Sequence, residues 1–178
     1  MSEHRSLPAR PDLRRLRDEA KARRRAGEFP SLALAQLALA REYGFASWPR
    51  LKLHVEALTL DAGARAEALV RSACSTDVRR ARMLLALDPP LARHDLACAC
   101  VTGEADEVRR RLAGRPELAR ASTGPLGRAP ILLACFSRLL RADPARESGI
   151  REVVDVLLEA GADPDARFTE GGWIQSTL

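Results

Sequence analysis

Apolar residues recur every three or four positions along much of the chain, which is the spacing of one face of an α-helix. The clearest example lies within residues 149–166. The apolar positions are Val153, Val156, Leu157 and Ala160. Gly161 follows them where a helix commonly ends in the left-handed conformation, and the Asp-Pro-Asp sequence at 163–165 favours a turn. The pattern therefore predicts an amphipathic helix with a defined end.

The same spacing predicts helices along most of the rest of the chain. The predicted ranges are 11–26, 31–43, 47–58, 64–74, 78–87, 95–102, 105–113 and a helix that starts within 129–135. Ser31 and Ser47 are suited to cap the second and third helices, and Gly44 is suited to end the second. Three helices are thus expected before Leu60.

Composition supports helices packed in thin layers. Hydrophobic residues make up 46% of the 178 residues but aromatic residues only 4%, so the core must be built from Leu, Ala and Val. Residues 1–10 are polar and lack the apolar stretch of a secretory signal, and the most apolar run, 31–40, is too short to span a bilayer. We therefore expect a soluble cytoplasmic protein. Four cysteines without Cys-x-x-Cys spacing are expected to be buried and reduced.

Positive charge is concentrated in the N-terminal third. Residues 1–60 hold 12 basic and 7 acidic residues, a net charge of +5 that equals the net charge of the whole chain. The arginines at 14, 15, 17, 23, 24 and 25 are interleaved in sequence with Asp12, Asp18 and Glu19. This interleaving favours a solvated helix face over a phosphate-binding surface, so nucleic acid is not the expected partner.

An internal repeat is visible when the chain is shifted by 27 positions. The shift aligns Leu85 with Leu112, Pro89 with Pro116, and the Leu-Ala-Arg sequence at 91–93 with the one at 118–120. Two related helical hairpins, 64–90 and 94–120, follow from this alignment. A third unit is predicted at 127–166, with an insertion at 138–148 in which Pro144 prevents one continuous helix.

Several of these segments resemble ankyrin repeats. Residues 149–166 resemble the second half of a repeat, with Gly149 at the turn between its helices, paired valines at 153 and 154, and an Glu-Ala-Gly-Ala-Asp exit from 159. Residues 129–135 resemble the Thr-Pro-Leu-His-Leu-Ala-Ala helix start, with Leu132 in place of the histidine. Residues 7–58 are similar to a segment found ahead of ankyrin repeats in bacterial proteins, and 171–178 resembles the start of a truncated repeat.

The resemblance implies an all-α fold: a short ankyrin-like helical-hairpin solenoid at 61–178 with an N-terminal helical cap at 1–60. It implies a non-catalytic scaffold that binds another protein through its finger loops and the concave face made by the first helix of each hairpin. The candidate binding residues are Arg128, Leu132, Phe136, Arg138, Arg167, Phe168 and Trp173. The identity of the partner is not encoded in the repeat, and self-association through the unfinished C-terminal repeat is a second expectation.

Two other functions compete with protein binding. Residues 36–55 resemble a helix-turn-helix that would offer Arg50, Lys52 and His54 to a DNA major groove, although Pro49 lies early in the supposed recognition helix. For an enzyme, the sequence holds no Gly-rich phosphate loop, His-Glu-x-x-His or Gly-x-Ser-x-Gly motif, and its three histidines are dispersed. The sequence therefore predicts no catalytic site, no cofactor and no metal.

Overall fold

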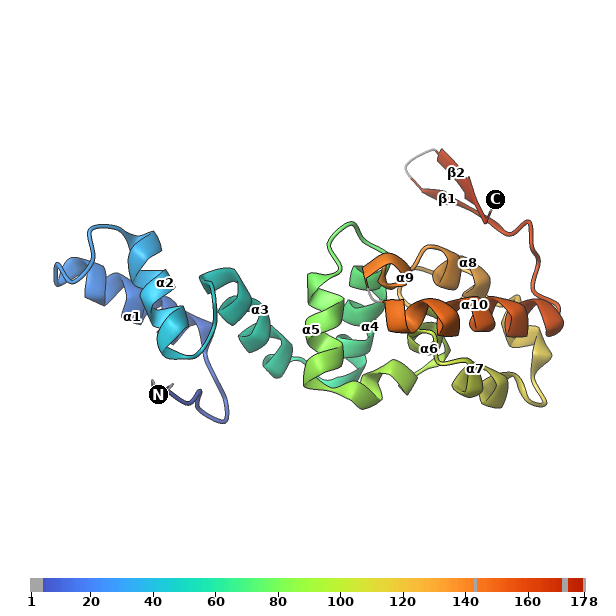
Figure 1. Cartoon of the computed structure of the whole chain (residues 1–178), viewed down its shortest axis with the longest axis horizontal. Coiled ribbons are helices and arrows are strands. Elements are labelled where there is room, and N and C mark those ends of the chain that lie inside the picture. Colours follow the sequence, from blue (N-terminus) through green and yellow to red (C-terminus); the bar gives the residue numbers. More distant parts are fainter. Residues whose placement is uncertain (1–4, 143, 171–172, 178) are drawn as a thin grey trace. The chain divides into compact units, whose positions relative to one another are not determined.

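The computed structural model describes residues 5–142, 144–170 and 173–177 of the chain, and these are mainly helical (Figure 1). The chain divides into two compact units, Met1–Asp61 and Ala62–Leu178. The break falls one residue beyond the boundary that the sequence pattern places at 60. Each unit has a hydrophobic core of its own, dominated by Leu, Ala and Val.

The N-terminal unit consists of α1 (Leu13–Arg25), α2 (Leu32–Glu42) and α3 (Trp48–Thr59). Two local signals set where these helices begin. The Asp12 carboxylate accepts a hydrogen bond from the Arg14 N–H at 2.7 Å, and the Ser31 hydroxyl accepts one from the Leu34 N–H at 3.3 Å. Each bond satisfies an amide at the start of a helix, where no backbone carbonyl is within reach. Gly44 ends α2 with a φ of +80°, as its position in the sequence predicts.

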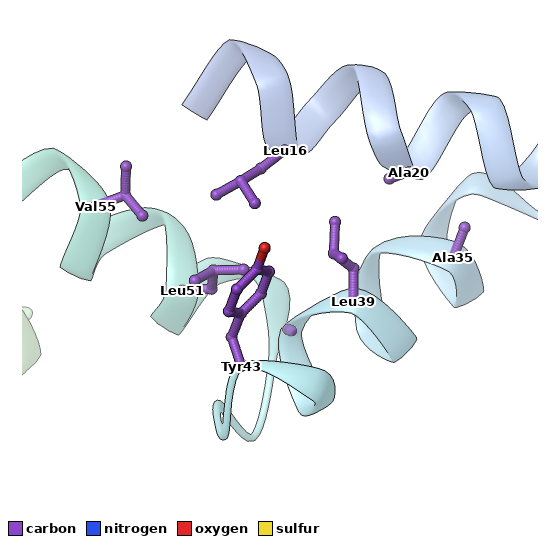
Figure 2. Close-up of a cluster of buried hydrophobic side chains, with 8 residues drawn as sticks. Leu16, Ala20, Ala35, Leu39, Tyr43, Leu51 and Val55 are labelled. Carbon is purple, nitrogen blue, oxygen red and sulfur yellow. The ribbon is translucent and has the colours of Figure 1, made fainter. Parts of the chain in front are cut away.

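The core of this unit lies where its three helices meet (Figure 2). Leu16 and Ala20 point from α1 toward Leu39 of α2 and toward Tyr43, which follows that helix, and Leu51 of α3 completes the contact. The alanines let the helices approach closely, which compensates for the scarcity of aromatic side chains. The larger residues Phe45 and Trp48 are half-buried at the margin of the core.

The C-terminal unit is built from successive pairs of helices. Its helices are α4 (Ala62–Ala73), α5 (Arg79–Leu87), α6 (Leu96–Thr102), α7 (Ala105–Leu112), α8 (Pro130–Cys135), α9 (Leu139–Ala142) and α10 (Pro144–Glu159). Helix α4 pairs with α5, α6 with α7, and α8 with α10. Between pairs, α6 packs against both α4 and α8, and α7 packs against α10, so α6 is buried along its whole length.

The 27-residue repeat has a direct structural counterpart. A short 3-10 helix follows α5 at Pro89–Arg93, and another follows α7 at Pro116–Ala119. The two prolines that the sequence aligned thus start equivalent turns, and Leu91 and Ala119 are buried within them. Each turn closes its helical pair before the chain enters the next.

The expectation that Gly149 forms the turn between two helices is wrong. Helix α10 begins at Pro144, which is tolerated in a first turn because no intrahelical N–H is needed there, and it continues through Gly149 without interruption. Gly149 instead faces Gly103, where a Cβ atom at position 149 would overlap the Gly103 carbonyl. The predicted insertion 138–148 is likewise divided between α9 and the first turns of α10.

A two-stranded antiparallel hairpin follows α10. Strand β1 (Arg167–Glu170) pairs with β2 (Trp173–Ser176), and Phe168 lies opposite Gln175. The hairpin forms a finger that follows the turn predicted at 163–165. Residues 173–176, which we assigned to a truncated repeat, therefore form the second strand of this finger, while Gly171, Gly172 and Leu178 lie outside the described residues.

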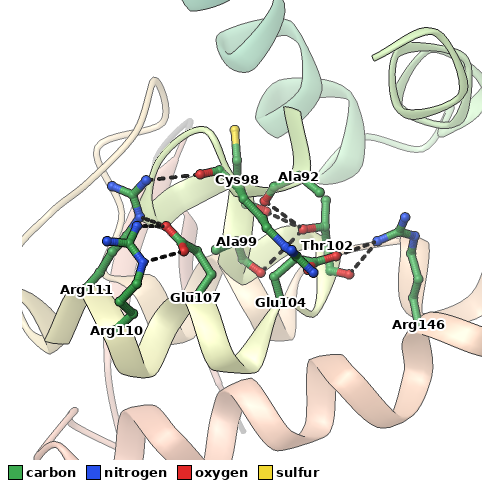
Figure 3. Close-up of polar contacts among 10 residues, drawn as sticks. Ala92, Cys98, Ala99, Thr102, Glu104, Glu107, Arg110, Arg111 and Arg146 are labelled. Atoms are coloured by element: carbon green, nitrogen blue, oxygen red, sulfur yellow. Dashed lines mark hydrogen bonds and ion pairs between the residues drawn. The ribbon is translucent and has the colours of Figure 1, made fainter. Parts of the chain in front are cut away.

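Glu107 and its arginine partners connect α7 to the turn that precedes α6 (Figure 3). The Glu107 side chain, only 9% exposed, pairs with Arg110 and with Arg111, whose Nε lies 2.6 Å from the carboxylate. Arg111 also donates hydrogen bonds to the carbonyls of Arg93, at 3.0 Å, and His94, at 2.8 Å. Hydrogen bonds from Arg110 and Arg111 lower the pKa of Glu107 to about 2.

We expect Glu107→Gln to destabilise the C-terminal unit at pH 7 by about 1–2 kcal/mol. Solvent around the exposed Arg110 screens part of the ion pair and keeps this free energy small. Because folding lowers the pKa of Glu107, its ionised carboxylate stabilises the folded unit. This stabilisation is complete above the pKa of the unfolded chain, about 4.5, and is lost as the pH falls toward 2. Urea unfolding at pH 7, 4 and 3 should therefore show the deficit shrinking by more than half. Glu147→Gln, which removes an exposed pair with Arg151, is the control. A pH-independent deficit would contradict the assignment.

Candidate interaction site

Three of the predicted binding residues lie along one side of α8. Arg128, Leu132 and Phe136 are spaced four residues apart, and this spacing places their side chains on one face of a helix. Arg128 lies two residues before the helix starts at Pro130, and Phe136 immediately follows its last residue. Leu132, at its centre, is 1% exposed. The three residues thus lie along one side of α8, where Leu132 contributes to the packed layer rather than to the surface.

The finger at 121–128 sets the position of Arg128. The Thr123 N–H donates to the Arg128 carbonyl at 2.9 Å, and the Gly127 N–H donates to the Gly124 carbonyl at 3.2 Å, which closes a tight turn. Gly124 has a φ of +65°, and a Cβ there would lie 2.7 Å from the Cβ of Ala97. Glycine is needed at 124 because the finger packs directly on α6.

Phe168 of the hairpin covers the α8 face. The Arg128 guanidinium carbon lies 3.6 Å from the centre of the Phe168 ring, and the Phe136 ring meets Phe168 edge-on with 5.4 Å between ring centres. Cation–π and edge-to-face contacts are each worth about 0.5–1.5 kcal/mol. Arg128, Phe136 and Phe168 therefore hold the hairpin against α8, and we call them the aromatic stack.

A pocket of about 370 Å³ opens beside the aromatic stack. Leu132 and Ala129 supply its apolar lining, and Phe168 forms one side. Its charged lining residues are Arg120, Arg128, Asp163 and Arg167, a balance of three positive charges to one negative. The pocket can accept an apolar side chain next to an anionic group.

Two of these lining residues were not predicted. Arg120 donates from Nε to the Gly161 carbonyl, and the Asp163 carboxylate accepts the Asp165 N–H at 2.9 Å. A signal for Arg120 was present in the 27-residue repeat, which aligns it with Arg93. Arg93 donates from Nε to Glu104 at 2.7 Å, so each arginine reaches from its own turn to a later element. For Asp163, the sequence indicated only a turn. Its place in the pocket depends on how the chain folds back after α10, which the local sequence does not show.

Of the remaining candidate binding residues, Arg167 lies at the pocket and Arg138 lies away from it. Arg167 is exposed and lines the pocket. Arg138 is exposed but is not among the pocket-lining residues, and its backbone N–H donates to the Ala73 carbonyl at 2.7 Å. The side chain of Trp173 lies outside the described part of the structure. Five of the seven candidates thus lie at the aromatic stack or the pocket, and Arg138 does not.

The residues proposed for a helix-turn-helix have varied surroundings. Arg50 is exposed, whereas Lys52 lies 3.6 Å from Glu56 in an ion pair. His54 packs against Phe45 with 4.9 Å between ring centres, and burial lowers the pKa of its imidazole. A lowered pKa favours the neutral ring, which offers less attraction to phosphate.

The cysteines only partly follow expectation. Cys98 and Cys100 are buried and Cys74 is half-buried, and burial raises the pKa of all three thiols, that of Cys74 to about 11. Cys135 is exposed at the end of α8, so the expectation that all four are buried is wrong there. The described residues include no group of three or more His, Cys, Asp or Glu side chains placed to hold a metal ion. Within this same part of the chain, no helix combines the length and the apolar character needed to cross a membrane.

Comparison with known proteins finds no matching family model, no matching curated protein and no matching solved structure.

Proposed function

We propose that the C-terminal unit is a non-catalytic, ankyrin-like scaffold that binds a segment of another protein in the pocket beside the aromatic stack. The observation that carries this proposal is the pocket itself. It places three arginines and an aspartate around an apolar lining formed by Leu132, Ala129 and Phe168. The surrounding helices are already packed, so the pocket needs little rearrangement to accept a ligand.

The arrangement of the helices supports a repeat scaffold. Helices α4, α6 and α8 pack in succession, and a finger precedes α8 as another follows α10. In repeat scaffolds each unit contacts mainly its neighbours, and the loops and first helices are free to meet a partner. The pocket joins one finger, one such helix and the following hairpin, which is where the ankyrin resemblance implies that binding residues lie.

The charge of the pocket indicates the chemistry of the partner. Arg167 is exposed, and Arg120 and Arg128 line the same space, so a carboxylate entering the pocket would meet more positive than negative charge. Arginine donates two parallel hydrogen bonds to a carboxylate, which adds geometric selectivity. We therefore propose a partner segment in which an acidic residue lies next to an apolar one.

Selection from a random peptide library displayed on phage tests this proposal with the intact chain. We expect enriched peptides to combine acidic and apolar residues, and Arg167→Glu to weaken their binding at least about tenfold, since it replaces an attractive charge by a repulsive one. Arg141→Glu, an equal charge reversal at an exposed position of α9 outside the pocket lining, should leave binding unchanged. Failure to enrich any peptide, or equal losses in both variants, would refute the proposal.

A further inference from the structure

Glu19 is half-buried on the side of α1 that meets the rest of the N-terminal unit. Glu19 forms ion pairs with Arg5 at 2.7 Å and with Arg23 at 3.0 Å. Arg23 also binds Glu42 of α2, and this hydrogen bond lowers the pKa of Glu42. These four residues neutralise one another on the side of α1 that meets the rest of the unit.

The other charged side of α1 is almost purely basic. Five of the six exposed cations of α1 lie there, namely Arg14, Arg17, Lys21, Arg24 and Arg25, whereas Arg15 lies beyond Asp18. At 100° per residue they fall within an arc of about 100° around the helix axis. We call these five residues the basic stripe. Asp18 borders the stripe and lies 3.4 Å from Lys21, whereas none of the four arginines forms an ion pair with a described residue.

We propose that the basic stripe binds the phosphate backbone of nucleic acid, a function separate from peptide binding by the C-terminal unit. Arg14 and Arg24 are ten residues apart, a rise of about 15 Å along the helix. Phosphates follow one another at about 3.4 Å of axis along each strand of a DNA duplex, so the stripe spans about four of them. Guanidinium groups suit this contact because they donate paired hydrogen bonds to phosphate oxygens.

The same arginines are less suited to an anionic membrane. A helix that lies in a membrane surface inserts its apolar face among the lipids. The apolar face of α1 is already used, because Leu16 is 6% exposed and Ala20 is fully buried in the core of the unit (Figure 2). The large exposed hydrophobic residues of the described chain are Leu34, Leu58, Leu158 and Ile174, and none lies on α1. Electrostatic attachment to phosphates along a rod therefore fits this helix better than insertion.

The experiment measures binding of the full chain to a fluorescein-labelled 20-base-pair DNA duplex by fluorescence anisotropy. With about four neutralised phosphates, affinity should fall on the order of 100-fold between 50 and 200 mM salt. The triple variant Arg14→Gln, Arg17→Gln and Arg24→Gln should weaken binding at 50 mM salt at least about tenfold and flatten the salt dependence. Glutamine is a good helix former, and all three side chains are exposed, so circular dichroism should show an unchanged melting temperature.

A matched control removes the same charge elsewhere in the same unit. Arg10→Gln, Arg41→Gln and Arg50→Gln also replace three exposed arginines, and they include the position that a helix-turn-helix would use. This variant should retain most of the affinity. No duplex binding at 50 mM salt, equal losses in both triple variants, or a larger loss in the control would each overturn the proposal. So would retention on vesicles of phosphatidylserine and phosphatidylcholine without any binding to the duplex.

Discussion

Gly149→Ala is expected to destabilise the C-terminal unit by about 2–3 kcal/mol, with a fall in Tm of roughly 10 °C. A Cβ at 149 would overlap the Gly103 carbonyl, and the backbone on both sides of this contact has little room to move. Gly103 has a φ of +81°, and a Cβ on Gly103 would in turn lie 2.8 Å from the Ile150 nitrogen. Helix α10 and the turn between α6 and α7 thus touch through backbone atoms.

The sign of this effect makes the prediction specific. Glycine inside a helix normally costs about 0.5–1 kcal/mol relative to alanine, so the same substitution would stabilise an unobstructed helix. Gly63→Ala provides this comparison, because Gly63 is exposed in α4 of the same unit. Thermal unfolding followed by circular dichroism should show a lower melting temperature for Gly149→Ala and an equal or higher one for Gly63→Ala. A stabilising Gly149→Ala would show that α10 and the α6–α7 turn do not approach this closely.

Leu39→Ala is expected to destabilise the N-terminal unit by about 2–5 kcal/mol and to leave the core of the C-terminal unit intact. Leu39 is fully buried where α1, α2 and α3 meet, and removal of its branched end leaves a cavity among close-packed alanines that cannot collapse to fill it. A unit of about 60 residues has a small margin of stability, so a loss of this size unfolds much of it.

Hydrogen–deuterium exchange resolves where this loss falls. In Leu39→Ala, amides of α1 and α2 should lose protection while those of α6 and α8 keep it, because the two units have separate cores. Leu133→Ala, at an equally buried position of α8, is the reciprocal variant and should expose α6 and α8 first. If Leu39→Ala lowered protection equally in both units, they would unfold as one cooperative body, and the division at Asp61 would have no thermodynamic meaning.

Local signals in the sequence were sufficient to locate most helices. The predicted range 11–26 corresponds to α1 at Leu13–Arg25, and 105–113 to α7 at Ala105–Leu112. The glycine at the end of α10 has the left-handed conformation that the pattern implies, with a φ of +88° at Gly161. Such features depend on residues within one or two turns of each other, and apolar spacing and cap residues report directly on that range.

Contacts between distant segments set the role of residues such as Gly149 and Phe168. Gly149 matched a turn residue in the repeat pattern, but its small size serves the approach to Gly103, which lies 46 positions earlier in the chain. Phe168 was a candidate binding residue in the sequence. The structure places it between Arg128 and Phe136, where it packs, and the open pocket lies beside it. Neither the approach of Gly149 to Gly103 nor the packing of Phe168 could be predicted from the residues of a single helix.

The charges of α1 show the same division between sequence and tertiary structure. The sequence determined that α1 is an arginine-rich amphipathic helix, because its composition and its spacing of leucine and alanine are local properties. In sequence order, Glu19 interrupts the arginines and argues against a phosphate-binding surface. The folded unit separates Glu19 from the basic stripe, because Glu19 pairs with Arg5 and Arg23 on a half-buried side of α1 while the stripe, bordered by Asp18, is exposed. The order of residues along the chain determined the helix. The tertiary structure decided which of its charged side chains face the rest of the unit and which face solvent.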